Sequence, residues 1–425
     1  MFNNLPHMFI KIILTFCVKV LGALSAFILS VFVAQKLSLE EAGYFFLMIA
    51  VLGLFNFFNL LGLHISTLRF VSIAYKDEKF TEVNGIAILS FLMVLSLGLM
   101  TLVFVCFFDE IVAKYLWGDS RLSFIFFYAA LISLPVSLNI LISNWLQAMS
   151  KAVVAVFFLS VSIPFIASLF LSLIQPYNST QVIEWYLIAA AISMTMCLIA
   201  FLFCCRVRNF KAVDCRKIIE TSIPIWGTSL VYVIINWSGQ FIASIWVDAS
   251  QIALLAIANR SALLVSLILV SVNMVVAPKY ASLYSNNKIE EIRFLAKKVT
   301  KVLSAIVFPF VMILALFAEF FLNFFGDGYV AASHLLIILL VGQFINVLSG
   351  SVGYLLNMTG NERDLNKVAI ATCVLVVFLN LTFIPHFGVV GAAISTSISI
   401  SFQNIVAALC VKKRLGFNIY HFWEK

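Results

Sequence analysis

The chain has 425 residues, of which 63% are hydrophobic and only 11% are charged, and its formal net charge is +8. Soluble domains carry about 25% charged residues, so this composition excludes a soluble fold. The apolar residues fall in runs rather than in the alternating ten-residue pattern of barrel strands. Because only helices and closed barrels satisfy their backbone in lipid, the sequence predicts an all-α polytopic membrane protein.

Twelve transmembrane helices are expected in chain order, separated by short polar or charged segments. They are predicted at residues 9–34, 43–66, 84–107, 122–146, 152–174, 186–205, 222–246, 253–276, 302–325, 334–356, 368–387 and 391–411. A helix of about 20 residues rises about 30 Å, which is the thickness of the hydrocarbon core. Each run is therefore long enough to cross a bilayer once.

The basic residues predict the orientation of these helices. If the N-terminus is cytoplasmic, the inner segments hold 22 of the 27 Lys and Arg residues, and the outer segments hold Lys36, Lys114 and Arg121 alone. The remaining two, Lys19 and Arg260, lie within helices. Cytoplasmic loops carry an excess of Lys and Arg. We therefore expect a multi-pass protein of the bacterial cytoplasmic (inner) membrane with both termini in the cytoplasm, and no nucleic-acid partner.

Weak internal similarity divides the helices into two halves. Gly118 follows the third predicted helix, and Gly326 follows the ninth at an offset of 208 residues, each before an Asp. Chance similarity between hydrophobic segments is the alternative. Parallel repeats of this kind form lobes with a binding site between them, and we expect two six-helix lobes around a central cavity. The predicted parts are an N-terminal lobe (residues 1–205), a basic cytoplasmic linker (206–221), a C-terminal lobe (222–411) and a basic cytoplasmic tail (412–425).

Two basic residues lie deep within predicted helices. Lys19 follows Lys11 by eight residues, about 12 Å along a helix, on a stripe of small and polar residues. Arg260 lies inside the eighth helix. Charges inside a bilayer are costly and normally face protein or a water-filled cavity. Lys19 either pairs with a polar neighbour to fix helix packing, or it faces the cavity and binds an anion. Ammonium and guanidinium groups bind phosphate oxygens by charge-assisted hydrogen bonds.

Amide side chains recur along several helices and are candidates for lining the cavity. These candidates are Asn56, Asn59, Asn236, Gln240, Asn259, Asn273, Gln343 and Asn346. The alternative for each is an interhelical hydrogen bond that only holds helices together.

Acidic residues lie near the outer ends of the helices. No membrane-embedded acid is evident, so Asp248 and Glu319 are candidates for an ion-coupling site by default only. Arg69, at the inner end of the second helix, either adds a third cation to the cavity or anchors the helix at the inner surface.

Enzyme and metal motifs are missing from the sequence. It contains no GxxxxGK[ST], HExxH or GxSxG segment. The eight Cys and five His residues show no ligand spacing. The chain is therefore predicted to be a membrane transporter without enzymatic activity, bound metal or cofactor.

Several segments in a fixed order carry a family resemblance. The N-terminal half contains KLSLEEAGYFFLM and GLHISTLRFV, and the C-terminal half contains AIANRSALL, VNMVVAPKYASLYSNNKIEEI, FGDGYVAASHLLIILLVGQFINVLSG, LLNMTGNERD and LNLTFIPHFGVVGAAISTSIS. In these segments and their order, the chain resembles polysaccharide-exporting flippases of the multidrug/oligosaccharidyl-lipid/polysaccharide (MOP) superfamily, in particular O-antigen (Wzx-type) and teichoic-acid exporters.

The resemblance implies a transport function in polysaccharide biosynthesis. The substrate would be an undecaprenyl-diphosphate-linked oligosaccharide, such as the O-antigen repeat unit of lipopolysaccharide, moved from the cytoplasmic to the periplasmic leaflet by alternating access. Such transport is often driven by a proton or sodium gradient. By position, Lys19 and Arg260 would hold the diphosphate, Arg69 would assist at the inner entrance, and the amides would contact sugar. Polysaccharide polymerase and chain-length proteins are candidate partners.

Three other functions are weighed against this one. A cation-coupled multidrug exporter of the same superfamily needs a buried carboxylate in the N-terminal lobe, where this chain has Lys19. An integral-membrane glycan polymerase or ligase needs a large outer loop, and the longest one predicted here is about residues 175–185. A non-transporting scaffold of a glycan assembly complex is the third.

Overall fold

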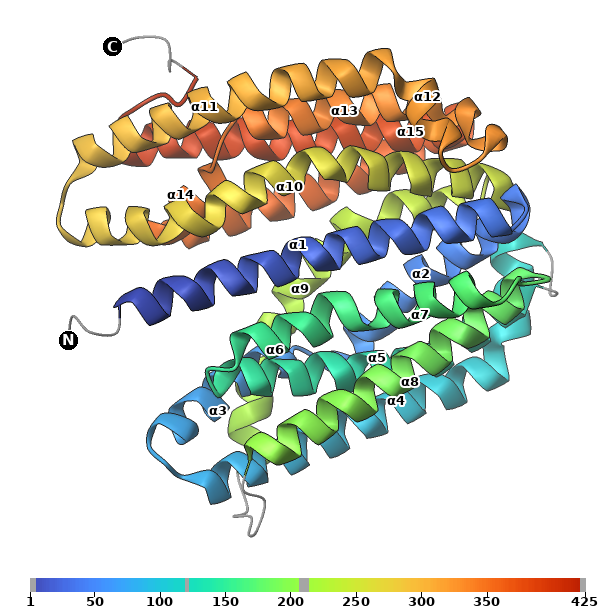
Figure 1. Ribbon diagram of the computed structural model, residues 1–425, viewed down its shortest axis with the longest axis horizontal. Coiled ribbons are helices and arrows are strands. Elements are labelled where there is room, and N and C mark those ends of the chain that lie inside the picture. Colours follow the sequence, from blue (N-terminus) through green and yellow to red (C-terminus); the bar gives the residue numbers. More distant parts are fainter. Residues whose placement is uncertain (1–4, 119–121, 206–213, 421–425) are drawn as a thin grey trace. The chain divides into compact units, whose positions relative to one another are not determined.

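The computed structural model describes residues 5–118, 122–205 and 214–420, with side chains from Ile13 onward. In these ranges all regular structure is helical. The chain divides into two compact units, residues 1–233 (unit 1) and 234–425 (unit 2), coloured from blue to green and from yellow to red in Figure 1.

Unit 1 contains the helices from α1 to the first part of α9. Their bounds are α1 Leu5–Lys36, α2 Leu39–Leu60, α3 Leu63–Lys76, α4 Phe80–Trp117, α5 Ser123–Ala148, α6 Ala152–Val156, the π-helix η3 Phe157–Val161, α7 Ser162–Leu173, α8 Ser179–Cys204 and α9 Cys215–Ala243. The division between the units falls inside α9. The predicted linker, residues 206–221, lies partly outside the described residues and stays a prediction, as does the function of the tail.

Unit 2 contains the second part of α9 and the helices that follow. Their bounds are α10 Ala249–Ser285, α11 Ile289–Leu316, α12 Ala318–Asn323, the 3-10 helix η4 Asp327–Ala332, α13 Ser333–Leu348, α14 Val352–Met358 and α15 Glu362–Leu415.

The number of membrane spans follows from the long helices. Eleven helical segments of the described chain are long and apolar enough to cross a membrane. One of them, α15, has 54 residues and a non-helical backbone at Gly388 (φ 57°, ψ −137°), so it consists of two spans that meet there. This break coincides with the predicted gap between residues 387 and 391. The prediction of an all-α membrane protein with about twelve spans in two lobes is thereby confirmed.

Two predicted helices are each divided by a break that hydropathy does not reveal. The predicted helix at residues 43–66 is two helices, α2 and α3, separated by Leu61 (φ 43°) and Gly62 (φ 74°). A Cβ atom at Gly62 would lie 2.6 Å from the backbone oxygen of Ser222 in α9. Both the left-handed backbone and this close approach require glycine there. The helix predicted at 334–356 is likewise divided into α13 and α14 beside Gly350 (φ 64°).

The helices also extend beyond their apolar runs. The span predicted at residues 84–107 is part of α4, which has 38 residues and is therefore about 57 Å long at 1.5 Å per residue. Hydropathy locates the part of a helix that faces hydrocarbon, whereas backbone hydrogen bonds continue into the polar ends. The predicted span is therefore shorter than α4 at both of its ends.

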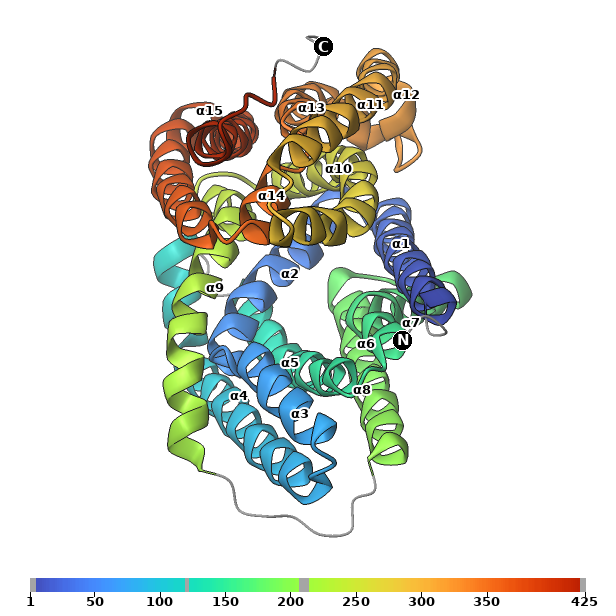
Figure 2. The same cartoon turned by 90° about the vertical axis from the view of Figure 1, so that its left-hand side faces the viewer.

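The fourth predicted span of each half occupies the same place in its unit. In unit 1, α5 packs against α2, α4 and α8 (Figure 2). In unit 2, α13 packs against α10, α11 and α15. This correspondence agrees with the repeat inferred from the sequence.

Small residues allow the closest helix contacts. A Cβ atom at Gly22 of α1 would lie 2.5 Å from Cβ of Ser160 in η3, and one at Gly342 of α13 would lie 2.8 Å from Cα of Ser397 in α15. Helices in lipid gain little from burying apolar surface against each other, so close backbone approach supplies much of their attraction.

Candidate functional site

Lys19 lies on α1, beside the surface of this helix that packs against η3 and α7 of the same unit. Gly22, about one turn further along, contacts η3, and Ser30 is fully buried. The Lys19 side chain is exposed and forms no hydrogen bond or ion pair with any described residue. Among the described residues, no polar neighbour neutralises Lys19. Its ammonium group is available to an anion.

The π-helix opposite Gly22 was not predicted from the sequence. In this wider turn the Ser162 N–H donates to the Phe157 carbonyl oxygen. The Phe158 carbonyl oxygen accepts from Asn139 Nδ2 at 2.9 Å and from Ser162 Oγ at 3.0 Å. Ser162 in turn contacts Ser193 Oγ at 2.6 Å. Such π-turns are frequent at functional sites. No periodicity in the sequence distinguishes these residues from an ordinary helix.

Arg260 lies on α10 in unit 2. It is half-buried, and the neighbouring Ile257 and Ser261 are fully buried. The guanidinium group is therefore held on a helix whose adjacent face is tightly packed.

Arg69 lies near the end of α3 in unit 1, is exposed, and lines a cavity of about 440 Å³.

The amides of unit 1 form contacts between helices. Asn59 is fully buried, its Nδ2 donates to Ser133 Oγ at 2.8 Å, and its Oδ1 accepts from Thr101 Oγ1 at 2.7 Å. Asn56 Oδ1 accepts from Ser137 Oγ at 2.8 Å. Asn59 therefore does not line an open cavity in this structure, because both of its polar atoms hold α2 to α4 and α5. Asn56 is half-buried and has an Nδ2 group that can still donate.

The amides of unit 2 are divided between buried and accessible positions. Gln343 is 3% exposed and accepts a 3.2 Å hydrogen bond from Asn346 Nδ2. Asn273 is also buried, and its Oδ1 has no hydrogen-bond partner among the described residues. Gln240, Asn259 and Asn346 are half-buried, and Asn236 is exposed.

The two acids considered for ion coupling lie at helix ends. Asp248 occupies the N-cap position of α10 and is exposed. Glu319 is exposed in the first turn of α12. Neither carboxylate is embedded in a span, because both residues begin helices rather than lying inside them.

An oxygen cluster around the buried Asn380 in unit 2, with the half-buried Ser238 and Thr396, was not recognised from the sequence. Asn380 of α15 is fully buried, its Nδ2 donates to Ser238 Oγ at 3.1 Å, and its Oδ1 has no partner in the described part of the chain. A Cβ atom at Gly239 would lie 3.5 Å from Thr396 Oγ1 and 3.9 Å from Asn380 Oδ1. In the sequence Asn380 is a single amide within an apolar run, and its partners are far away in the chain.

The spans and their division into two units define a polytopic α-helical membrane protein. The chain belongs to the polysaccharide biosynthesis protein family, whose family model matches residues 10–284. The MatE family model matches residues 224–382. The resemblance inferred from the sequence is thereby confirmed. No curated protein matches the chain in sequence.

Several solved structures of membrane proteins share the fold. The lipid II flippase MurJ in an inward closed conformation aligns with a TM-score of 0.74 at 17% identity, covering 94% of this chain and 87% of that one. An inward-facing multidrug resistance MATE family transporter aligns with a TM-score of 0.74 at 15% identity, covering 95% and 98%. A MOP superfamily transporter from Pyrococcus furiosus, described as having a binding pocket of reverse polarity, aligns with a TM-score of 0.64 at 15% identity, covering 97% and 96%.

Proposed function

We propose that this protein is a flippase that moves an undecaprenyl-diphosphate-linked oligosaccharide from the cytoplasmic to the periplasmic leaflet of the bacterial inner membrane by alternating access. The oligosaccharide is an O-antigen or a related surface polysaccharide repeat unit. Both termini then lie in the cytoplasm, and polymerase and chain-length proteins of the same pathway act on the product.

The observation that carries this proposal is the unpaired ammonium group of Lys19. A lysine within a span is costly unless it meets an anion or water, and this one has no partner among the described residues. A diphosphate supplies two adjacent anionic groups, each able to accept charge-assisted hydrogen bonds. Arg260 supplies a second cation with a fixed fork of donors that matches phosphate oxygens.

A multidrug exporter of the same superfamily is the other candidate function. The MatE match in the C-terminal half fits it. A cationic drug, however, needs a carboxylate in the span that faces it. In the described chain α1, α5 and α7 contain no acid, and the acids of α2, Glu40 and Glu41, lie in its first turn. The charges therefore favour an anionic substrate.

Coupling to an ion gradient has a candidate that does not involve an acid. Asn380 Oδ1, Thr396 Oγ1 and Ser238 Oγ are neutral oxygens inside unit 2. Amide and hydroxyl oxygens accept a cation but do not titrate near neutral pH. Sodium coupling therefore fits this cluster better than proton coupling, and Asp248 and Glu319 are the weaker candidates.

The proposed function is tested with the purified full-length protein in liposomes. A labelled undecaprenyl-diphosphate oligosaccharide is placed in one leaflet and its arrival in the other is measured. Lys19→Ala and Arg260→Ala are expected to abolish transfer, while Lys114→Ala, which removes an exposed lysine at the end of α4, is expected to leave it unchanged. Transfer of a cationic dye without transfer of the oligosaccharide would instead identify a multidrug exporter. Normal transfer by both the Lys19 and Arg260 variants would contradict the site assignment.

A further inference from the structure

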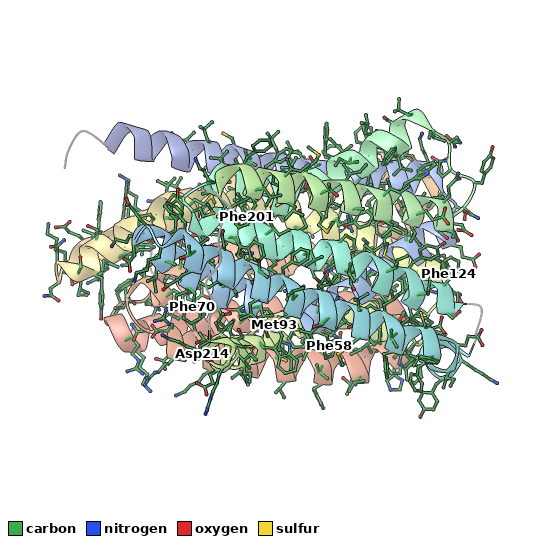
Figure 3. All side chains as sticks on the ribbon, turned by 90° about the horizontal axis from the view of Figure 1, so that it is seen from below. Phe58, Phe70, Met93, Phe124, Phe201 and Asp214 are labelled. Atoms are coloured by element: carbon green, nitrogen blue, oxygen red, sulfur yellow. The ribbon has the colours of Figure 1, made fainter. Side chains whose placement is uncertain are left out.

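The cavity beside Arg69 lies where α3 ends and where α4 and α9 begin. Its volume is about 440 Å³. Figure 3 shows Phe70 and Asp214, two of its lining residues, at the same end of unit 1. According to the distribution of basic residues, this end faces the cytoplasm. It is a different part of the unit from the deep position of Lys19 on α1.

The charges around the cavity are balanced. Among the described residues, three cations and three carboxylates line it, and these are Arg69, Lys79, Lys217, Asp77, Glu82 and Asp214. The formal charges of these six residues sum to zero. A ligand gains most from this described lining by carrying both signs of charge.

Charges of both signs are left without an ionic partner from the described chain. Lys79 Nζ pairs with Asp77 at 3.3 Å. Arg69, in contrast, forms no hydrogen bond or ion pair with a described residue. Lys217 Nζ lies 6.0 Å from the centroid of the Phe70 ring and forms no ion pair with a described residue. Asp214 Oδ1 accepts a hydrogen bond from the backbone N–H of Arg216 at 3.0 Å but forms no described ion pair. Two cations and one carboxylate thus remain available in the same cavity.

The cavity is apolar beneath these charges. Ala74, Ile86 and Ile218 line it and are buried, whereas Ile73 is exposed at its edge. On α4, the residues Glu82, Ile86, Leu89 and Met93 follow helical spacing and share one face. Ile86 belongs to the core of unit 1, and Leu89 and Met93 pack against that core. In Figure 3, Met93 lies further from this end of the unit than Phe70 and Asp214. A ligand with a charged head and an apolar chain fits a cavity that has charged residues on one part of its lining and apolar residues on another.

We propose that this cavity binds a zwitterionic phospholipid whose head group carries a primary ammonium, as phosphatidylethanolamine does. Arg69 and Lys217 bind the phosphate, Asp214 accepts the ammonium, and an acyl chain leaves the cavity past the exposed Ile73. A phosphatidylglycerol head group leaves the Asp214 carboxylate without a cation. A phosphatidylcholine head group offers no N–H to a carboxylate. The bound lipid joins the first turns of α9 to α3 and α4, and this role is independent of the transported glycan.

The proposal is tested by lipid retention on the detergent-purified full-length protein. Palmitoyl-oleoyl phosphatidylethanolamine, phosphatidylglycerol and phosphatidylcholine are titrated separately, and native mass spectrometry measures the bound fraction. We expect the protein to retain phosphatidylethanolamine about five-fold more strongly than either other lipid, as the loss of one charge-assisted contact implies.

Two variants remove one charge each and preserve the fold. Asp214→Asn keeps an oxygen that caps the start of α9, since Asn and Asp are equally good caps, and Lys217→Gln changes an exposed residue. Asp214→Asn is expected to abolish the preference for phosphatidylethanolamine, because it removes the charged acceptor of the ammonium group. Lys217→Gln is expected to weaken the retention of all three lipids, because each of them carries the phosphate. The matched control is Lys298→Gln, because Lys298 Nζ lies 5.9 Å from the Phe294 ring in unit 2, a similar pair outside the cavity. Its lipid preference should equal that of the unmodified protein.

Three results would overturn the proposal. They are equal retention of all three lipids, stronger retention of phosphatidylglycerol than of phosphatidylethanolamine, and an unchanged preference in Asp214→Asn. Because none of these measurements uses the transported substrate, they are independent of the outcome of the liposome assay.

Discussion

Trp226 of α9 stacks on Phe57 of α2, with ring centroids 5.1 Å apart and ring planes 13° apart, and its Nε1 donates to the Phe57 carbonyl oxygen at 3.2 Å. One turn earlier, Ser222 Oγ contacts Ser66 Oγ at 2.6 Å. Residues far apart in the chain thus attach the start of α9 to the break between α2 and α3. The first part of α9 belongs to unit 1 for this reason, although hydropathy assigns the whole helix to the second half.

Replacing Trp226 tests how much this attachment stabilises unit 1. Trp226→Ala removes the stacked ring and the hydrogen bond together, and we expect it to lower the free energy of unfolding by about 2 kcal/mol. Trp226→Phe keeps the stacking and loses only the hydrogen bond, so its cost should be about 1 kcal/mol. Thermal unfolding in detergent measures both. Equal stability of the Ala and Phe variants would show that the ring contact contributes nothing.

Of the two residues that separate α2 from α3, Gly62 is expected to tolerate substitution less than Leu61. In Gly62→Ala, the new Cβ would lie 2.6 Å from the Ser222 carbonyl oxygen and 2.9 Å from the backbone nitrogen of Trp226. The left-handed backbone costs about 1–2 kcal/mol in addition. We expect a loss of about 3 kcal/mol or more, seen as reduced yield of folded protein and a lower unfolding temperature.

Gly227 provides the matched control for this substitution. A Cβ atom added at Gly227 of α9 has no heavy atom within 4 Å. Gly227→Ala should therefore be neutral or slightly stabilising, because alanine is the better helix former by about 1 kcal/mol. If the two alanine variants were equally stable, the close approach at Gly62 would not be the reason that glycine stands there.

The sequence reveals the spans because their signal is local. Apolar runs of the right length locate each helix, and Gly388 falls in the gap predicted between the last two. The break at Leu61 and Gly62 is different, since it is set by the contact with Ser222 in a helix that lies far away in the chain. Hydropathy averages over such a break and predicts a single helix.

The candidate site was predictable only in part, for a related reason. A lysine within an apolar run is visible in the sequence, and Lys19 is indeed without a described partner. An amide such as Asn59 looks identical whether it lines a cavity or holds helices together, and only its contacts with Ser133 and Thr101 decide between the two. The importance of Asn380 depends on an oxygen left unpaired in the fold, and no local pattern reports it.

The C-terminal residues that follow α15 are expected to stabilise unit 2. Phe417 and Ile419 are 4% and 1% exposed and belong to its apolar core, and Tyr420 Oη contacts Ser349 Oγ at 2.9 Å in the break after α13. Phe417→Ala should lower the free energy of unfolding by about 3 kcal/mol. Phe294→Ala, at a phenylalanine that is 68% exposed, should change it by less than about 0.5 kcal/mol. Thermal unfolding of the two variants checks the difference, and an equal response would contradict the packing of the tail.

Sodium is expected to stabilise the protein through the oxygen cluster at Asn380. A cation that binds only the folded state raises the unfolding temperature with its concentration. Replacing choline chloride with sodium chloride at constant ionic strength should therefore raise the unfolding temperature of the unmodified protein by about 2 °C or more. Asn380→Ala removes the unpaired oxygen and should abolish the response. Asn404→Ala removes an amide that donates only within its own helix, to the Ile400 carbonyl oxygen, and should retain it. A sodium response that persists in Asn380→Ala would place the ion elsewhere, because that variant lacks the one buried oxygen of the cluster that has no protein donor.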